Sequence, residues 1–237
     1  MGAFTVTRHT TRKGRARTAS VALALLALGG TPLVWASPAQ AQIGRSALAD
    51  PATNVPRTAA MNQTCSLETA PACQLAVVRG IDQARAAEGV RALTLPSDYD
   101  RLSTAAQLLV LTESERVDRG LPGFTGLSAE LDGLAEKGAI SNADPIGPAG
   151  QAWGSNWAGG EGSALLADYD WMYDDGLGSP NLDCTSAAAS GCWDHRRNIV
   201  GDYGPHPSMG AAATTVKGVT SVTELLSSAP AEATPQA

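Results

Sequence analysis

The stretch 171–200 gathers side chains that could bind a ligand or move a proton, in a chain with only three histidines. His195 could coordinate a metal ion or hold a ligand group, because an imidazole changes its charge near neutral pH. An apolar core would not need an imidazole, two guanidinium groups and an amide beside a cysteine and a tryptophan. We therefore expect a functional surface here; the alternative is that His195 is structural and ties a short helix to a neighbouring loop. The candidate residues of this surface are His195, Asp174, Asp175, Arg196 and Asn198.

The paired acids Asp174 and Asp175 are expected at the end of a helix, where the helix dipole disfavours each acid by about 0.3–1 kcal/mol. Arg196 or Arg197, a bound cation, or the backbone of the next turn could offset this cost. A salt-bridged turn is the simplest interpretation. A calcium site is the alternative, although the EF-hand pattern is absent.

Hydrolytic chemistry has little support in the sequence. Ser155 lies in no G-x-S-x-G turn, and an H-E-x-x-H metalloprotease motif is absent. Binding is therefore favoured over catalysis. Tryptophans more often lie in a core, but four of them within about forty residues could line a groove for a ligand. They are Trp153, Trp157, Trp171 and Trp193.

The amino-terminal part predicts export. Five basic residues precede an apolar run at 21–35, and Ala39 and Ala41 form a small-x-small cleavage pattern. The run is short and interrupted, so no stable membrane span is expected once residues 1–41 are removed after Ala41. Removal takes away five basic residues and no acid, which moves the net charge from −6 to −11. Such an acidic domain repels nucleic acid, so a nucleic-acid partner is not expected.

The four cysteines become interpretable in an exported protein, because disulfides persist in oxidising compartments. Cys65 and Cys73 are eight residues apart, and so are Cys184 and Cys192. Four cysteines allow three pairings. Short-range pairing, Cys65 with Cys73 and Cys184 with Cys192, is the simplest of the three.

Helix signals dominate the first half of the chain and strand signals the end, which predicts an α+β fold. Residues 42–60 are expected to be a flexible lead and 228–237 a disordered tail. Glu115 and Arg119, four residues apart, should pair along one helix face. The expected helices are 74–88, 103–119, 128–137 with Gly138 ending it, 163–173, and 195–200 capped by Asp194; the expected strands are 153–158, 209–216 and 221–226, with a hairpin turn at Lys217 and Gly218.

Several segments together resemble the CAP superfamily of secreted, SCP-like domains. The resemblance covers 102–227, and 61–101 would be an added amino-terminal helical extension. The matching segments follow the order of the family: TESERVDRGLPGFTGLSAELDGLA, WGSNWAGG, ADYDWMYDDG and, most specific, CWDHRRNIV with its His-Arg-x-Asn motif.

The resemblance implies a CAP/SCP-like α-β-α sandwich with a small antiparallel sheet, and a central cleft near His195 and Asn156. Family members that bind zinc use two histidines and two acids, but here the matched positions lack one histidine and one acid. No cofactor is therefore expected; His195 and Asp174, with Asp144 from a loop, remain as candidates for a divalent metal. The implied function is non-catalytic binding of a lipid, a small apolar molecule or a cell-envelope component. An extracellular hydrolase acting on envelope or peptide substrates is the alternative.

Overall fold

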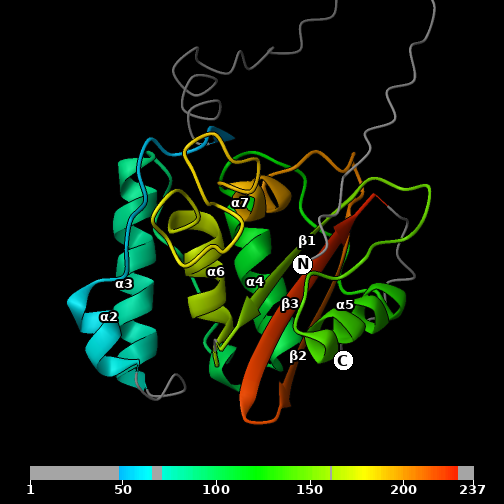
Figure 1. Ribbon diagram of the computed structural model, residues 1–237, viewed down its shortest axis with the longest axis horizontal. Coiled ribbons are helices and arrows are strands. Elements are labelled where there is room, and N and C mark those ends of the chain that lie inside the picture. The colour runs from blue at the N-terminus through cyan, green and yellow to red at the C-terminus, as the bar shows by residue number, and fades with distance from the viewer. Residues whose placement is uncertain (1–47, 66–70, 161, 229–237) are drawn as a thin grey trace, which may run out of the picture. The chain divides into compact units, whose positions relative to one another are not determined.

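The computed structural model describes residues 48–65, 71–160 and 162–228. The expected signal peptide, its cleavage site and residues 229–237 of the expected tail lie outside the described residues. The described part combines helices with one three-stranded antiparallel sheet, which confirms the α+β class (Figure 1). The elements are α2 (Ala59–Thr64), α3 (Pro71–Ala87), a 3₁₀ turn (Tyr99–Arg101), α4 (Thr104–Val117), α5 (Ala129–Ser141), β1 (Trp153–Gly159), α6 (Ala164–Tyr173), α7 (Asp194–Ile199), β2 (Ser208–Val216) and β3 (Val219–Ser227).

The sheet has the order β1-β3-β2, so the last of the described strands is the central one. Lys217 and Gly218 join β2 to β3, and both adopt left-handed backbone angles, with φ of 53° and 83°. Two successive left-handed residues suit the twist of a tight hairpin. The predicted hairpin is therefore confirmed.

Helices cover both faces of the sheet (Figure 1). Neighbouring residues of a strand point to opposite faces, and β3 uses this alternation. Thr223 donates to the carbonyl of Ala135 on α5 at 2.9 Å, whereas Glu224 accepts from Thr112 on α4 at 2.7 Å. The central strand is thus buried between two helical layers.

Two predicted helices begin as expected. The hydroxyl of Ser103 accepts from the backbone of Ala106, and that of Ser163 accepts from the backbone of Leu166, at 3.3 and 3.1 Å. Serine is a favoured residue at this position because it satisfies a free amide of the first turn. These caps start α4 and α6.

The prediction was wrong at two helix termini, the carboxyl end of α5 and the amino end of α7. Helix α5 does not stop at Gly138 but continues to Ser141, and Asn142 ends it with φ of 51°. Gly138 instead permits a close approach: a β-carbon there would lie 2.9 Å from the carbonyl oxygen of Ala143. At α7, Trp193 with φ of 61° precedes the helix, so Asp194 is its first residue and not its cap.

Both short-range disulfides are present, which confirms that pairing. The α-carbons of Cys65 and Cys73 are 4.6 Å apart, and those of Cys184 and Cys192 are 4.4 Å apart. The second bond closes a loop whose buried sulfur atoms pack with Trp193. That loop leads directly into α7 and therefore helps to place His195.

Residues 48–57 differ from the expected flexible lead because they contact the main domain at several points. The amide of Val55 donates to the carbonyl of Tyr173 at 2.8 Å, and Arg57 forms an ion pair with Asp170. Asp50 pairs with Arg197 at 2.6 Å. We call residues 48–57 the amino-terminal strap.

A buried ionic network joins the expected extension to the rest of the fold. Glu115 on α4 accepts from Arg85 on α3 at 2.8 Å. It also pairs with Arg119, which confirms the predicted pair, and both side chains are buried. Glu88 pairs with Arg119 at 2.6 Å and with Arg196 of α7 at 3.0 Å. Helix α3 is therefore bound by charge to α4, and Glu88, directly after α3, is bound by charge to α7. None of the helices in the described part of the chain has the length and hydropathy needed to cross a lipid bilayer.

Candidate functional site

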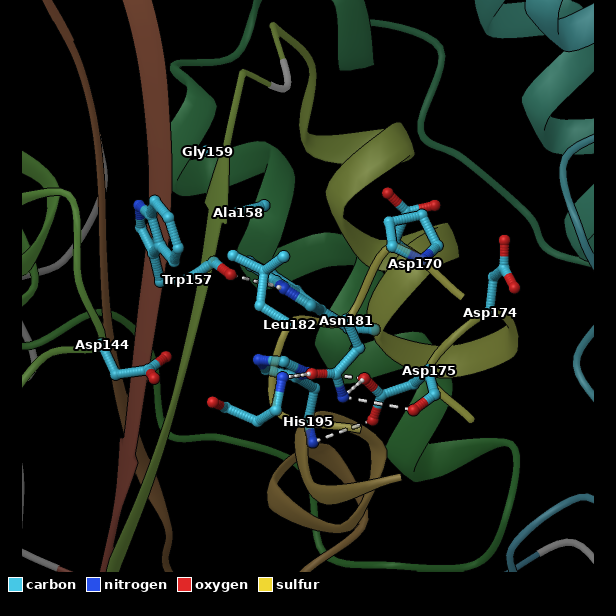
Figure 2. Close-up of a pocket in the computed structure, with 13 residues that line it drawn as sticks. Asp144, Trp157, Ala158, Gly159, Asp170, Asp174, Asp175, Asn181, Leu182 and His195 are labelled. Atoms are coloured by element: carbon cyan, nitrogen blue, oxygen red, sulfur yellow. Dashed lines mark hydrogen bonds and ion pairs between the residues drawn. The ribbon is translucent and has the colours of Figure 1, made fainter. Parts of the chain in front are cut away.

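A cavity of about 240 Å³ lies between β1, the end of α6, the loop that follows it, and α7. Figure 2 shows Trp157 and Asp144 on the strand side of this cavity and Asp170, Asp174 and Asp175 on the side of α6. We call it the His195 cavity. Its described lining residues are Asp144, Trp157, Ala158, Gly159, Asp170, Trp171, Asp174, Asp175, Pro180, Asn181, Leu182, Asp183 and His195.

Asp175 fixes the imidazole of His195 at the edge of the cavity (Figure 2). The Nδ1 atom of His195 lies 2.6 Å from the Oδ1 atom of Asp175, and the amide of His195 donates to Oδ2 at 3.1 Å. Asn181 donates to the same carboxylate at 2.6 Å. These contacts turn Nδ1 toward Asp175 and leave Nε2 as the nitrogen available to a ligand.

The charges around His195 favour its protonated form. Burial lowers the pKa of the imidazole, but the hydrogen bond and the charge of Asp175, together with the charges of Asp144 and Asp183, outweigh burial and raise that pKa above 6.5. Burial raises the pKa of Asp175, while His195 opposes this. The pair is therefore an imidazolium beside a carboxylate in the pH range between the two pKa values.

Replacing Asp175 by asparagine should lower the pKa of His195, because the neutral amide keeps the hydrogen bond but removes the charge. Because the pKa of His195 is higher in the folded state than in the unfolded state, its protonation stabilises the fold at pH values below the unfolded pKa, which is near 6.5. This stabilisation is lost as the pH rises through the folded pKa. Asp175→Asn should therefore also weaken that pH dependence. NMR titration of the His195 ring protons in both proteins measures the change. An unchanged or higher pKa in the variant would contradict the pairing.

Asp170 and Asp174 share Arg57 as their charged neighbour, whereas Asp144 lies near His195. Asp170 pairs with Arg57 of the strap, and the same guanidinium lowers the pKa of Asp174, although burial, the larger effect, raises it. Burial raises the pKa of Asp144, while the charge of His195 and the backbone of Trp157 act in the opposite direction. At Asp175 the cost of the paired acids is thus offset by the imidazole of His195, by the side-chain amide of Asn181 and by the backbone of α7.

Three candidate residues lie behind the cavity and do not line it. Asn156, fully buried on β1, donates to the carbonyl of His195 at 3.2 Å. Asn198 donates to Asn156 at 3.0 Å and to the carbonyl of Ser155 at 2.8 Å. Arg196 is buried and donates to the carbonyl of Met172 at 2.8 Å. These side chains hold α7 against β1 and α6, so they position His195.

No family model, curated protein or solved structure matches this chain. The resemblance to the CAP superfamily therefore stays a proposal, and the site is described from its own residues. Of the four tryptophans, Trp157 and Trp171 line the cavity, while Trp153 is 42% exposed outside it and Trp193 packs with the second disulfide.

Metal ligands do not converge in the described part of the chain. No three side chains of His, Cys, Asp or Glu lie together there as a possible metal site. The acids of the cavity are instead spread over its walls, from Asp144 on one side to Asp174 on the other (Figure 2). His195 and Asp174, the metal candidates from the sequence, have Asp175 and Arg57 as their charged neighbours.

Glu224 is a buried residue of this region that the sequence analysis missed. Its carboxyl group accepts from Asn156 at 2.7 Å and from Thr112 at 2.7 Å, and it is completely buried. Burial raises its pKa to about 7, despite these hydrogen bonds. The sequence did contain a signal: Glu224 is the single acid in an otherwise uncharged predicted strand. A charged residue in a strand that is central in its sheet has no exposed face to occupy.

Proposed function

We propose that this protein is a secreted, CAP-like binding domain that holds a lipid, a small apolar molecule or a cell-envelope component in the His195 cavity without chemical turnover. The observation that carries the proposal is a preformed hollow with apolar walls and a fixed polar group at its edge. Trp157, Trp171 and Leu182 supply apolar surface, while His195 is held in one orientation by Asp175. Small-molecule sites commonly combine apolar walls with a few placed polar groups.

The size of the cavity limits what enters it. About 240 Å³ is smaller than the roughly 300–1,000 Å³ of sites that enclose a drug-sized ligand. A small molecule, or one end of a larger one, would therefore occupy it. Leu182 at the mouth is 79% exposed and available to cover such a ligand.

A hydrolase is the alternative, and the pairing of His195 with Asp175 favours it, because a carboxylate can orient an imidazole for proton transfer. Two features oppose it. The described lining residues include no serine, threonine or cysteine that could act as a nucleophile. The lining acids would also repel the negative charge that develops on a carbonyl or phosphoryl oxygen during hydrolysis.

Two measurements separate binding from catalysis. Native mass spectrometry of protein purified from culture medium should reveal a bound small molecule, and Trp157→Leu should reduce its occupancy. Trp153→Phe, which changes a tryptophan outside the cavity, is the matched control. Turnover of an ester, peptide and glycan panel by the wild type, lost in His195→Ala, would establish the hydrolase instead.

Export is tested by the amino terminus of the mature protein. Cleavage after Ala41 predicts that the protein recovered from culture medium begins at Gln42. Two disulfides support an oxidising destination. Amino-terminal sequencing provides the measurement, and a membrane fraction that retains residues 1–41 would overturn the prediction.

A further inference from the structure

We propose that the His195 cavity binds an organic ammonium group, such as the trimethylammonium end of choline. This inference rests on the proposed binding function and names the chemistry of the ligand. Three independent features of the cavity support it: its charge, its aromatic wall and the spacing of its acids.

The acids that line the cavity outnumber the cations that form ion pairs with them. Five aspartates and one histidine line it. A protonated His195 balances Asp175, and Arg57 balances Asp170. Three carboxylates, those of Asp144, Asp174 and Asp183, then remain in excess. A concave surface with one sign of charge concentrates ions of the opposite sign.

The aromatic wall of the cavity, Trp157 and Trp171, has no free hydrogen-bond donor to offer a ligand. The indole nitrogen of Trp157 donates to the hydroxyl of Ser221 at 2.8 Å, and that of Trp171 donates to the carbonyl of Trp157 at 3.3 Å. Both N–H groups are therefore already used within the protein. What Trp157, which is partly exposed, presents to a ligand is apolar and π surface, which attracts cations and above all weakly hydrated ones. Trp171 is 2% exposed and adds little to this surface.

The spacing of the acids distinguishes an organic cation from a metal ion. A metal needs several ligand atoms within bonding distance of one point, and the described residues form no such group. Asp144 lies beside the strands and Asp174 follows α6, on opposite sides of the cavity (Figure 2). Acids that surround a hollow without converging suit a bulky cation whose charge is spread over its methyl or methylene groups.

The decisive experiment compares choline with the uncharged alcohol in which a carbon atom replaces the nitrogen of choline. The two probes share one shape, so a difference in affinity reports charge alone. Binding is followed by calorimetry and by tryptophan fluorescence of the full mature chain. We expect choline to bind at least tenfold more tightly than its neutral analogue, and added salt to reduce this difference.

Matched variants locate the site. Asp144→Asn removes one charge with almost no change in size, and it should weaken choline binding about three- to tenfold. Asp98→Asn removes an exposed acid outside the cavity and should leave binding unchanged. Trp157→Leu keeps apolar bulk but removes the ring, and it should weaken choline binding by about threefold or more. Circular dichroism establishes that each variant is folded.

The outcomes separate this inference from the proposed function. Equal binding of choline and its neutral analogue would overturn the ammonium proposal while leaving the binding function intact. Binding of neither probe, together with native protein that carries no ligand, would overturn both. Choline binding that Asp144→Asn and Trp157→Leu leave unchanged would place the ligand elsewhere and also overturn the inference.

The ammonium group could belong to a free amine or to a lipid headgroup, and vesicles distinguish these sources. Sedimentation with phosphatidylcholine vesicles, absent with phosphatidylglycerol vesicles and blocked by free choline, would identify a headgroup. Binding of free choline without sedimentation would identify a soluble amine. Preference for phosphatidylglycerol would contradict the charge of the cavity and the inference with it.

Discussion

Replacing Glu115 by leucine is expected to lower the free energy of unfolding by about 3–5 kcal/mol. The side chains of Glu115, Arg85 and Arg119 are all completely buried. Leucine would leave two buried guanidinium groups without the carboxylate between them, and Tyr173 would lose the acceptor of its hydroxyl, now 2.9 Å away. Removing one partner of a buried ion pair costs far more than the intact pair contributes.

The control is an ion pair of the same chemistry at the surface. Asp50 and Arg197 lie 2.6 Å apart, but their side chains are 36% and 46% exposed. Asp50→Ala should cost less than about 1 kcal/mol, because water solvates the remaining arginine. Urea unfolding of the wild type and both variants at one pH gives the comparison. Similar losses in the two variants would mean that burial does not set the energy of the network.

Replacing Glu224 by glutamine should stabilise the protein by about 2–4 kcal/mol at pH 8 and by little at pH 5. The folded pKa of Glu224 is raised from 4.5 to about 7, so the folded state binds its proton more tightly than the unfolded state does. Stability is therefore lost as pH rises from about 4.5 to about 7. Glutamine carries no charge and still offers an acceptor to Asn156 and a hydrogen-bonding group to Thr112.

The measurement is the difference in unfolding free energy between variant and wild type at the two pH values. Other buried acids, such as Asp168 and Asp175, have raised pKa values too, but they are common to both proteins and largely cancel in the difference. Glu136→Gln on the exposed face of α5 is the matched control and should show no pH-dependent difference. A stabilisation equally large at pH 5 would show that charge burial is not its cause.

Local signals in the sequence predicted the fold where local chemistry determines it. The cap at Ser103, the start of a helix at Ser163 and the Lys217-Gly218 turn depend on nearby backbone, so a few neighbouring residues suffice to predict them. Gly138 misled the prediction because its small size serves contact with Ala143, which the pattern of α5 does not reveal. The hydrogen bonds of the strap were likewise invisible, because every partner is distant in the chain.

The candidate site was also predicted only in part from the sequence. His195 and Asp175 were both predicted from the sequence to belong to one site, and the structure places them in contact. The sequence did not reveal that Asn156 supports α7 from behind, since its bond to the carbonyl of His195 depends on how β1 and α7 pack. Glu224 was missed for the same reason: its neighbour Thr112 is 112 positions away.

The strap also determines an order of events during synthesis. Its contacts join residues 113 to 147 positions apart, as in the pairs Arg57–Asp170 and Asp50–Arg197. The start of the domain therefore cannot dock until α6 and α7 have been made and have found their places. Contacts that close such long loops form late, because closing the loop costs conformational entropy of all the residues between the two ends. The surface at the end of α6, beside the His195 cavity, is consequently covered only after these elements have folded.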